Sequence, residues 1–330
     1  MQHWSQRERT ILLSAFAQAV RDRCFSRNTG NPLVCQTVRA TVDCVSQTFR
    51  EYDKVDPRLD QNRVTSRILQ QQFKGYKKHD PKEKHQKAIP LSVIRKLYEG
   101  QTNFELAVAD LLTIGIFFCM RSCEYLKVPS HENRRTKLLK VHNFRFFSLN
   151  DELDKEKDNL ESASSVCITF EEQKNGEKFE SVTLHCTIDK LLCPVKASAR
   201  VITRLRRTTS KQDIKNLGIN SYFSEAEKVE ITSHHAIVML KKTVETIGES
   251  TLGFKSSEIG THSIRSGGAM EMALAKIEVY TIKLIGRWKS DAFIRYIQKQ
   301  IREFSSDVSD RMLTNEHFTH VPCFKQLVTK

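Results

Sequence analysis

The first 80 residues carry apolar side chains at helical spacing. Apolar residues recur every three to four positions in the segments 11–25, 37–52 and 63–78. In the second segment, Val38, Val42, Val45 and Phe49 fall on one stripe of a helix. A period near 3.6 residues is the main signature of an amphipathic α-helix. The pattern therefore predicts a helical domain over residues 1–80.

A polar, lysine-rich segment follows at 77–90, with the sequence KKHDPKEKHQKAIP. A polar composition that ends in proline is typical of a linker. We therefore place a linker at 77–90 and a second domain at 91–330. Helical spacing returns in this second domain at 91–99, 104–120, 193–207, 234–248 and 267–277.

Two segments of the second domain instead alternate apolar and polar residues. They are SVCITFEE at 165–172 and FESVTLHCT at 179–187, and QKNGEK separates them. Asn175-Gly176 is a strong hairpin signal because both residues tolerate a positive φ. The segment 150–164 before them is polar and is predicted to be a loop. The expected fold is mainly α with a small antiparallel β-hairpin or sheet.

Net charge narrows the choice of partner. The chain has 53 Lys and Arg against 39 Asp and Glu, which gives +14, and residues 1–88 hold 17 of the former against 9 of the latter. Such an excess indicates an acidic partner, most simply nucleic acid. The longest apolar run, at 111–120, is about half of what a spanning helix needs. No signal peptide is visible at the start of the sequence, so we expect no membrane partner and no secretion.

Cysteine spacing argues against a metal site. The nine cysteines include no C-x-x-C pair and no Cys/His cluster with zinc spacing. We therefore expect reduced thiols, an intracellular location and no metal.

The basic residues include candidates for binding a phosphate. His262 and Arg265 form an H-x-x-R pattern at the start of a helix, which places both side chains on one face. The glycines at 267–268 would let the backbone approach a ligand closely. Arg121 directly follows the apolar run, and Glu124 could hold its guanidinium. The H-x-x-R pattern would also fit an ordinary capped helix start, and Arg121 with Glu124 would also fit an ordinary buried ion pair.

Further candidates lie on the hairpin and near the C-terminal end. Lys174 lies at the hairpin tip and could protonate a leaving oxygen, with Lys178 as the rival. Trp288 and Tyr296 follow in GRWKSDAFIRYI, and a tyrosine phenol becomes a nucleophile only where cations favour the phenolate. Taken singly, a lysine at a hairpin tip could simply be solvated, and the two aromatic residues could simply serve packing.

Taken in order, these residues resemble a known family. The series Arg121, Lys174, His262-x-x-Arg265, Trp288 and Tyr296 resembles the tyrosine recombinases, also called phage integrases. The wording of MRSCEYLK and GRWKSDAFIRYI is similar to eukaryotic transposon recombinases of the Crypton and DIRS groups. The absence of a reverse-transcriptase segment makes the Crypton group the nearer match. The resemblance covers about 90–300 well, and 1–85 only as a plausible helical domain that clamps DNA.

The resemblance implies a site-specific DNA recombinase that needs neither metal nor ATP. Tyr296 would be the nucleophile and form a 3′-phosphotyrosyl link, while Arg121 and Arg265 would bind the phosphate oxygens. His262 would act as general base and acid, Lys174 would protonate the leaving 5′-oxygen and Trp288 would support the phosphate. Glu124 would orient Arg121.

The resemblance also implies an assembly on DNA. The two domains would form a C-shaped clamp around duplex DNA, and linker lysines would contact its backbone. The C-terminal tail at 297–330 would dock on a neighbouring protomer, giving a tetramer on paired sites and a monomer off DNA. A eukaryotic protein of this kind would be nuclear, and otherwise cytoplasmic. The linker lysines concerned are Lys77, Lys78, Lys82, Lys84 and Lys87.

One interval departs from the family pattern. Trp288 and Tyr296 are eight residues apart, slightly closer than is usual. Tyr280 is the nearest competitor, but it precedes Trp288. The alternative functions are an inactive, domesticated DNA-binding protein and a relaxing enzyme similar to type IB topoisomerases. An unrelated basic helical protein would scatter these side chains.

Overall fold

A computed structural model describes most of the chain. The described residues are 4–26, 30–81, 86–100, 102–129, 136–149, 151–174, 176–208, 214–224, 227–290 and 294. Within these ranges no helix is both long enough and apolar enough to cross a bilayer.

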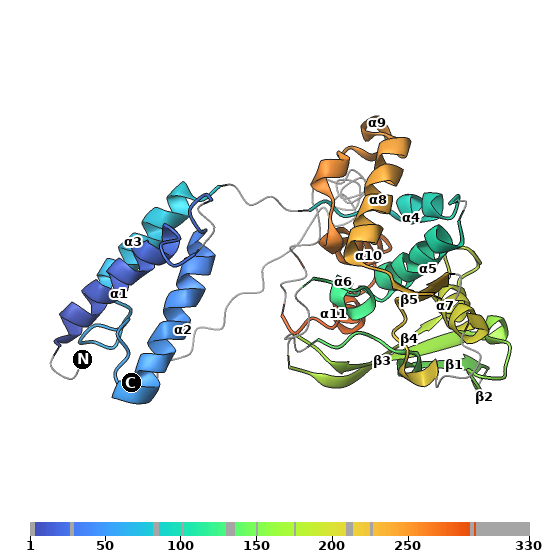
Figure 1. Cartoon of the computed structure of the whole chain (residues 1–330), viewed down its shortest axis with the longest axis horizontal. Coiled ribbons are helices and arrows are strands. Elements are labelled where there is room, and N and C mark those ends of the chain that lie inside the picture. The colour runs from blue at the N-terminus through green and yellow to red at the C-terminus, as the bar shows by residue number, and fades with distance from the viewer. Residues whose placement is uncertain are drawn as a thin grey trace, which may run out of the picture. The chain divides into compact units, whose positions relative to one another are not determined.

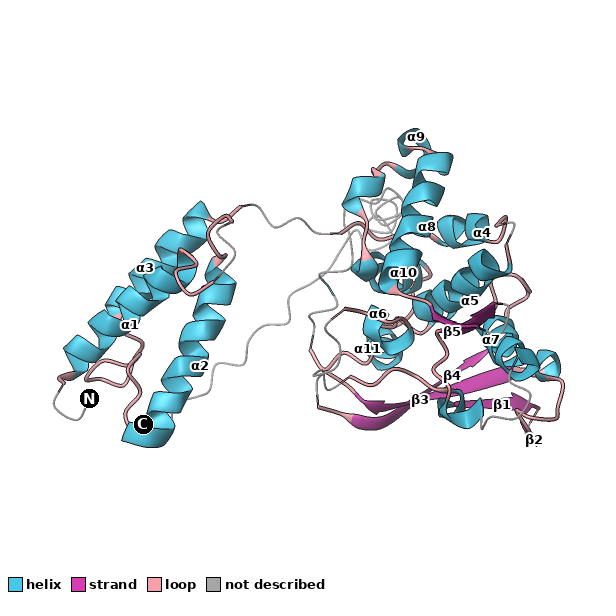
Figure 2. Ribbon diagram, in the orientation of Figure 1, coloured by secondary structure: helices cyan, strands magenta, loops and turns pink. Residues whose placement is uncertain are grey.

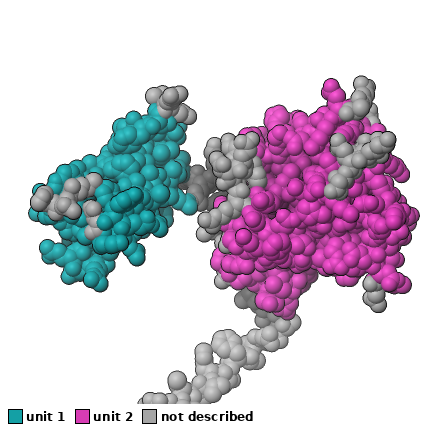
Figure 3. All heavy atoms as spheres, turned by 60° about the horizontal axis from the view of Figure 1, so that its bottom comes forward, with its two compact units in different colours: residues 1–84 teal, residues 85–330 magenta. Residues whose placement is uncertain are grey.

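The chain divides into two compact units, Met1–Lys84 and His85–Lys330 (Figure 3). The boundary falls inside the segment 77–90. Each unit has its own apolar core, so each is described separately.

Unit 1 contains three helices, labelled in Figure 1: α1 (Gln6–Arg21), α2 (Cys35–Asp53) and α3 (Arg67–His79). They confirm the three helices predicted from periodicity, although α3 begins four residues later than predicted. Buried residues from all three helices form the core, among them Leu13, Val38, Val42, Leu69 and Phe73. Burying these side chains supplies the main stabilisation of a unit this small.

Unit 2 contains a four-stranded antiparallel sheet with the strand order β2-β1-β3-β4. In the long central pair, Cys167 faces Thr183 and Glu172 faces Lys178, and Val166, Ile168 and Phe170 are buried on one face of β3. The strands are β1 (Phe144–Ser148), β2 (Asp151–Leu153), β3 (Ser165–Glu172) and β4 (Lys178–His185), and β5 (Ser221–Ser224) pairs with β6 (Glu227–Glu230) in a second sheet.

Helices form the rest of unit 2 (Figure 2). Helix α7 packs against β3 and β4, and α5 packs against α7 and α10. Helix α5 is buried along almost its whole length. The α-helices are α4 (Leu91–Leu97), α5 (Asn103–Phe117), α6 (Ser122–Tyr125), α7 (Pro194–Thr208), α8 (Ser233–Ile247), α9 (Glu249–Leu252), α10 (Thr261–Leu274) and α11 (Val279–Gly286). The 3-10 helices are η1 (Val141–Asn143), η2 (Leu160–Ser162), η3 (Ile214–Asn216) and η4 (Ser256–Glu258).

The predicted fold class is confirmed, and the sheet is larger than the one hairpin. Strands β3 and β4 match the predicted pair, and Gly176 at the turn has φ +85°, as the hairpin signal requires. Strand β1 was not predicted. The segment predicted as a polar loop at 150–164 contains β2 and η2, because pairing with β1 orders it.

Candidate phosphate-binding site

Arg121 lies in the turn between α5 and α6. Cys119 has φ +45° there, which turns the chain sharply after the buried helix α5. The backbone N–H of Arg121 donates to Glu124 Oε2 at 2.8 Å, and Arg121 Nη1 pairs with Glu124 Oε1 at 3.0 Å. The Glu124 side chain is 1% exposed and that of Arg121 is 19% exposed. Glu124 therefore holds Arg121 as predicted, with part of the guanidinium left open to solvent.

Arg265 lies in the first half of α10 and is buried. Its Nη1 donates to the carbonyl oxygen of Cys119, and its Nη2 donates to that of Gly286 at 2.6 Å. Its guanidinium carbon lies 4.4 Å from the ring centroid of Trp288. Burial and the charge of Arg121 lower the pKa of Arg265 to about 10, so the side chain stays charged at neutral pH. Arg265 thus joins the Arg121 turn to the end of α11.

Two glycines on α10 serve packing, which corrects the prediction that they approach a ligand. A Cβ on Gly267 would lie 2.4 Å from the carbonyl oxygen of Ile89, and one on Gly268 would lie 2.1 Å from that of Ile116. Both positions therefore need glycine because the backbone of α10 passes close to protein carbonyls. This close approach brings α10 against the end of α5, next to the Arg121 turn.

His262 lies at the start of α10, and its side chain is partly exposed. Its backbone N–H donates to Gln86 Oε1 at 2.8 Å. Partial burial lowers the pKa of His262, and the positive charges of Arg265, Lys174 and Arg121 lower it further. The imidazole is therefore neutral at pH 7 and can accept a proton.

Lys174 is exposed at the tip of the β3–β4 hairpin. The charge of Lys174 is one of those that lower the pKa of His262. The hairpin tip therefore brings Lys174 toward Arg121 in the α5–α6 turn and toward the basic residues of α10. Three segments far apart in sequence contribute to one group of cations.

Trp288 packs directly over the end of α11. A Cβ on Gly286 would lie 1.7 Å from the Trp288 ring, so glycine is needed there. The Trp288 ring in turn covers the Arg265 guanidinium, an arrangement that favours a cation. The structure thus brings Trp288 together with Arg265.

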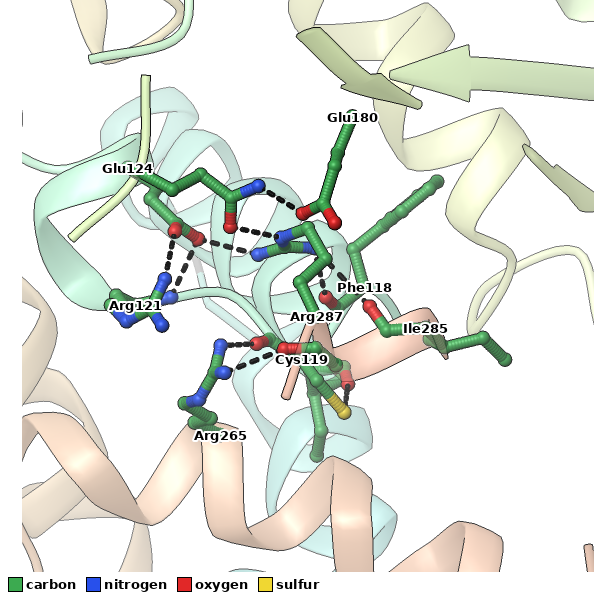
Figure 4. A network of polar contacts seen from close by, with 11 residues as sticks. Phe118, Cys119, Arg121, Glu124, Glu180, Arg265, Ile285 and Arg287 are labelled. Atoms are coloured by element: carbon green, nitrogen blue, oxygen red, sulfur yellow. Dashed lines mark hydrogen bonds and ion pairs between the residues drawn. The ribbon is translucent and has the colours of Figure 1, made fainter. Parts of the chain in front are cut away.

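A second buried arginine, Arg287, was not predicted. Its side chain is 1% exposed, and its Nη2 pairs with Glu124 Oε2 at 2.8 Å (Figure 4). Burial alone would raise the pKa of Glu124, but the charges of Arg287, Arg265 and Arg121 outweigh it, and the net shift of the pKa is downward. One carboxylate thus offsets three neighbouring guanidiniums. In the sequence, the position of Arg287 between an apolar helix end and Trp288 is the feature that could have indicated its burial.

The remaining predicted residues lie elsewhere or outside the described ranges. Tyr296, Lys82 and Lys84 are outside the described residues. Lys77 and Lys78 are exposed on α3, and the backbone N–H of Lys87 donates to the Glu258 carbonyl oxygen at 2.9 Å. Among the described residues, no group of three or more His, Cys, Asp and Glu side chains could hold a metal ion.

A site of this kind can bind an anion. Arg121, Lys174 and His262 present N–H donors, while the buried Arg265 bonds to the carbonyl oxygens of Cys119 and Gly286 and contributes its charge. Among the described residues, the carboxylate of Glu124 lies against these guanidiniums. Guanidiniums fit the paired oxygens of a phosphate and keep their charge. Arg265 is buried, so its attraction for a nearby anion is stronger than it would be in water.

Known structures share this fold. The chain matches the Tn1549 transposon integrase bound to circular intermediate DNA with a TM-score of 0.52 at 12% identity, over 92% of this chain and 85% of that one. The same integrase bound to transposon right end DNA gives 0.50 at 11% identity, with equal coverage. The XerH site-specific recombinase bound to palindromic difH gives 0.45 at 14% identity, over 92% and 70%. No family model and no curated sequence matches the chain. The fold is therefore that of the tyrosine recombinases.

Proposed function

We propose that this protein cleaves and rejoins duplex DNA at specific sites through a covalent 3′-phosphotyrosyl intermediate. One observation carries the proposal: Arg265 donates to the carbonyl oxygen of Cys119 in the turn that carries Arg121, and Arg287 bonds both to Glu124 beside that turn and to Gln173 beside Lys174. Three segments far apart in sequence therefore meet. An ordinary helix cap or a solvated hairpin lysine would not require this convergence.

The proposed reaction transfers two protons, one from the attacking tyrosine and one to the leaving 5′-oxygen. The Tyr296 oxygen attacks the phosphorus, and its proton passes to the neutral His262. The bond to the 5′-oxygen breaks, and Lys174 gives that oxygen a proton. Arg121 and Arg265 offset the charge that grows on the non-bridging oxygens. Rejoining runs these steps in reverse, so the bond energy is conserved and no ATP is needed.

Basic side chains on α3 support duplex DNA as the substrate. Arg67, Gln71, Lys74 and Lys78 are exposed, and their spacing of three and four residues places them on one stripe of the helix. The opposite side of α3 buries Leu69, Phe73 and Tyr76 in the core of unit 1. A basic stripe on a core-anchored helix fits a phosphate backbone.

The arrangement of the domains, the oligomeric state and the source of the protein are proposed from the sequence resemblance alone. We propose a clamp of two domains closed by the linker lysines, a monomer off DNA and a tetramer on paired sites. The wording of the Arg121 and Trp288 segments favours a Crypton-like mobile element, and a eukaryotic source would place the protein in the nucleus.

The test is to trap the covalent protein–DNA intermediate. The full chain would be incubated with a pool of randomised DNA duplexes, each nicked next to the position where cleavage would release a short fragment. Loss of the fragment prevents rejoining, so covalent protein–DNA complexes accumulate and can be resolved in denaturing gels. We expect such a complex with the natural chain and none with Tyr296→Phe, because only the phenol oxygen can form the link.

The result also separates the alternatives. Complex formation by Tyr280→Phe but not by Tyr296→Phe identifies Tyr296 as the nucleophile. DNA binding without any covalent complex would refute the proposed reaction and favour an inactive, domesticated DNA-binding protein. Relaxation of supercoiled DNA regardless of sequence would favour a topoisomerase-like enzyme.

A further inference from the structure

Arg287 occupies a backbone position that usually takes glycine. It follows the last residue of α11 with φ +55° and ψ +47°, in the left-handed region. Glycine is common at this position because other residues cost about 1–2 kcal/mol there. Strain of this kind persists where surrounding contacts outweigh it. The contacts of the side chain therefore need an explanation.

All three guanidinium nitrogens of Arg287 donate to acceptors in other segments. Nη2 binds Glu124 at 2.8 Å, and Nη1 donates to the carbonyl oxygen of Phe118 at 3.1 Å. Nε donates to Gln173 Oε1 at 3.1 Å, and the guanidinium carbon lies 3.5 Å from the ring centroid of Phe170. Arg287 thus joins α11 to the α5–α6 turn and to the β3–β4 hairpin (Figure 4).

Both ends of this contact lead to residues of the proposed site. Glu124 holds Arg121 through two bonds. Gln173 immediately precedes Lys174, and its amide nitrogen donates to Glu180 on β4. Gln173 is 1% exposed, so the residue beside Lys174 is anchored in the core while Lys174 itself is exposed. The guanidinium of Arg287 therefore bonds to Glu124, which holds Arg121, and to Gln173, which precedes Lys174.

We propose that Arg287 is a positioning residue, which fixes the hairpin tip relative to the Arg121 turn so that Lys174 can protonate the leaving 5′-oxygen. The inference rests on the proposed function, because it assigns no activity of its own. It adds that Gln173 transmits the position of Arg287 to Lys174. Lysine in place of Arg287 would keep the charge beside Glu124, but its single ammonium cannot reach both Glu124 and Gln173 in the same geometry.

A change of leaving group tests this role directly. Two nicked duplexes would carry the sequence that the natural chain cleaves, one with the ordinary 5′-oxygen and one with sulfur at that bridging position. A thiolate leaves without a proton because a thiol has a reference pKa of about 8.5. The sulfur substrate therefore needs no general acid. Cleavage rates would be measured on both substrates for Arg287→Lys, Gln173→Met and Lys174→Ala.

We expect all three variants to lose on the order of 10²-fold on the oxygen substrate, since a positioned acid contributes about that much. On the sulfur substrate all three should come within about tenfold of the natural chain. The matched control is Arg200→Lys, which changes the ion pair of Arg200 with the buried Asp110 and should leave the ratio of the two rates unchanged. Thermal melts would show that each variant is folded.

Two outcomes overturn the inference. One is an equal loss on both substrates by Arg287→Lys and Gln173→Met, which would mean a general structural role. The other is full cleavage of the oxygen substrate by these variants. Failure of the natural chain to cleave either substrate would instead refute the proposed function, so the two failures are distinguishable. Gln173→Met keeps the test decisive if Arg287→Lys does not fold, because it leaves the Arg287–Glu124 pair in place.

Discussion

Among the described residues of unit 2, two carboxylates are buried, and each is shared by two arginines. Glu124 binds Arg121 and Arg287, and Asp110 binds Arg200 and Arg204. Both carboxylate side chains are 1% exposed. The chemistry of the two networks is therefore the same, and the difference between them lies in what they connect.

The Asp110 network joins two regular helices. Arg200 and Arg204 lie one turn apart on α7 and keep 30% and 24% of their side chains exposed. Tyr98 completes the network, with its hydroxyl 3.0 Å from Asp110 Oδ1. These contacts hold α7 against α5 and reach none of the predicted site residues.

The Glu124 network instead joins irregular turns. Its arginines come from the α5–α6 turn and from the left-handed residue after α11, and Arg287 is fully buried. Helices α5 and α7 also pack against each other through apolar side chains, whereas a turn depends more on individual side-chain contacts for its position. The comparison teaches that similar ion pairs can serve helix packing in one place and the geometry of a site in another.

The largest expected effect separates the two carboxylates. Glu124→Gln leaves three guanidiniums without their shared negative charge, so Arg121 and Arg265 shift and DNA cleavage should fall on the order of 10²-fold per folded molecule. Asp110→Asn should lower the free energy of unfolding by about 1–3 kcal/mol and leave cleavage per folded molecule unchanged. Covalent-complex rates and denaturant melts measure the two effects. Equal losses of cleavage in both variants would contradict the comparison.

An intermediate effect concerns pH. Partial burial and the cations of the site lower the pKa of His262, so its neutral form persists below the usual histidine value of about 6.5. The acid limb of kcat/KM for cleavage should therefore lie below that pH. Arg265, Lys174 and Arg121 are the charged groups that act on this imidazole. Lys174→Ala removes one of these charges, so the pKa rises and the acid limb moves to higher pH.

The control for the pH prediction comes from the other network. Arg200→Lys retains every charge near His262 and should leave the acid limb in place. A profile for Lys174→Ala that does not move, or that moves to lower pH, would show that the hairpin lysine does not act on His262 in solution.

The sequence predicted the parts of the site that follow local rules. Arg121 with Glu124 and His262 with Arg265 each fall within one turn of a helix, where spacing decides which side chains meet. The hairpin was predictable because Gly176 takes a positive φ. Their convergence was predicted only from a family resemblance, since no spacing rule relates segments that lie this far apart in the chain.

Other features were missed for physical reasons. Arg287 lies one residue beyond a helix end, and the direction of its side chain depends on a left-handed backbone that usually calls for glycine. Strand β1 has only five residues, and the segment SLND at its end contains no glycine to mark a tight hairpin. The glycines of α10 were assigned to a ligand because sequence cannot show whether a close neighbour is a ligand or the carbonyl oxygens of Ile89 and Ile116.

The smallest expected effect tests whether burial gives the Glu124 network its importance. Lys289, two residues after Arg287, also contacts the hairpin through an ion pair with Glu177, but the two side chains are 59% and 40% exposed. An exposed pair contributes about 0–1 kcal/mol and is screened by salt. Lys289→Ala should therefore slow cleavage of the oxygen substrate by no more than about threefold at low salt, and the difference should vanish at high salt. If Lys289→Ala slowed cleavage as much as Arg287→Lys, the position of the hairpin would depend on the number of its contacts and not on their burial.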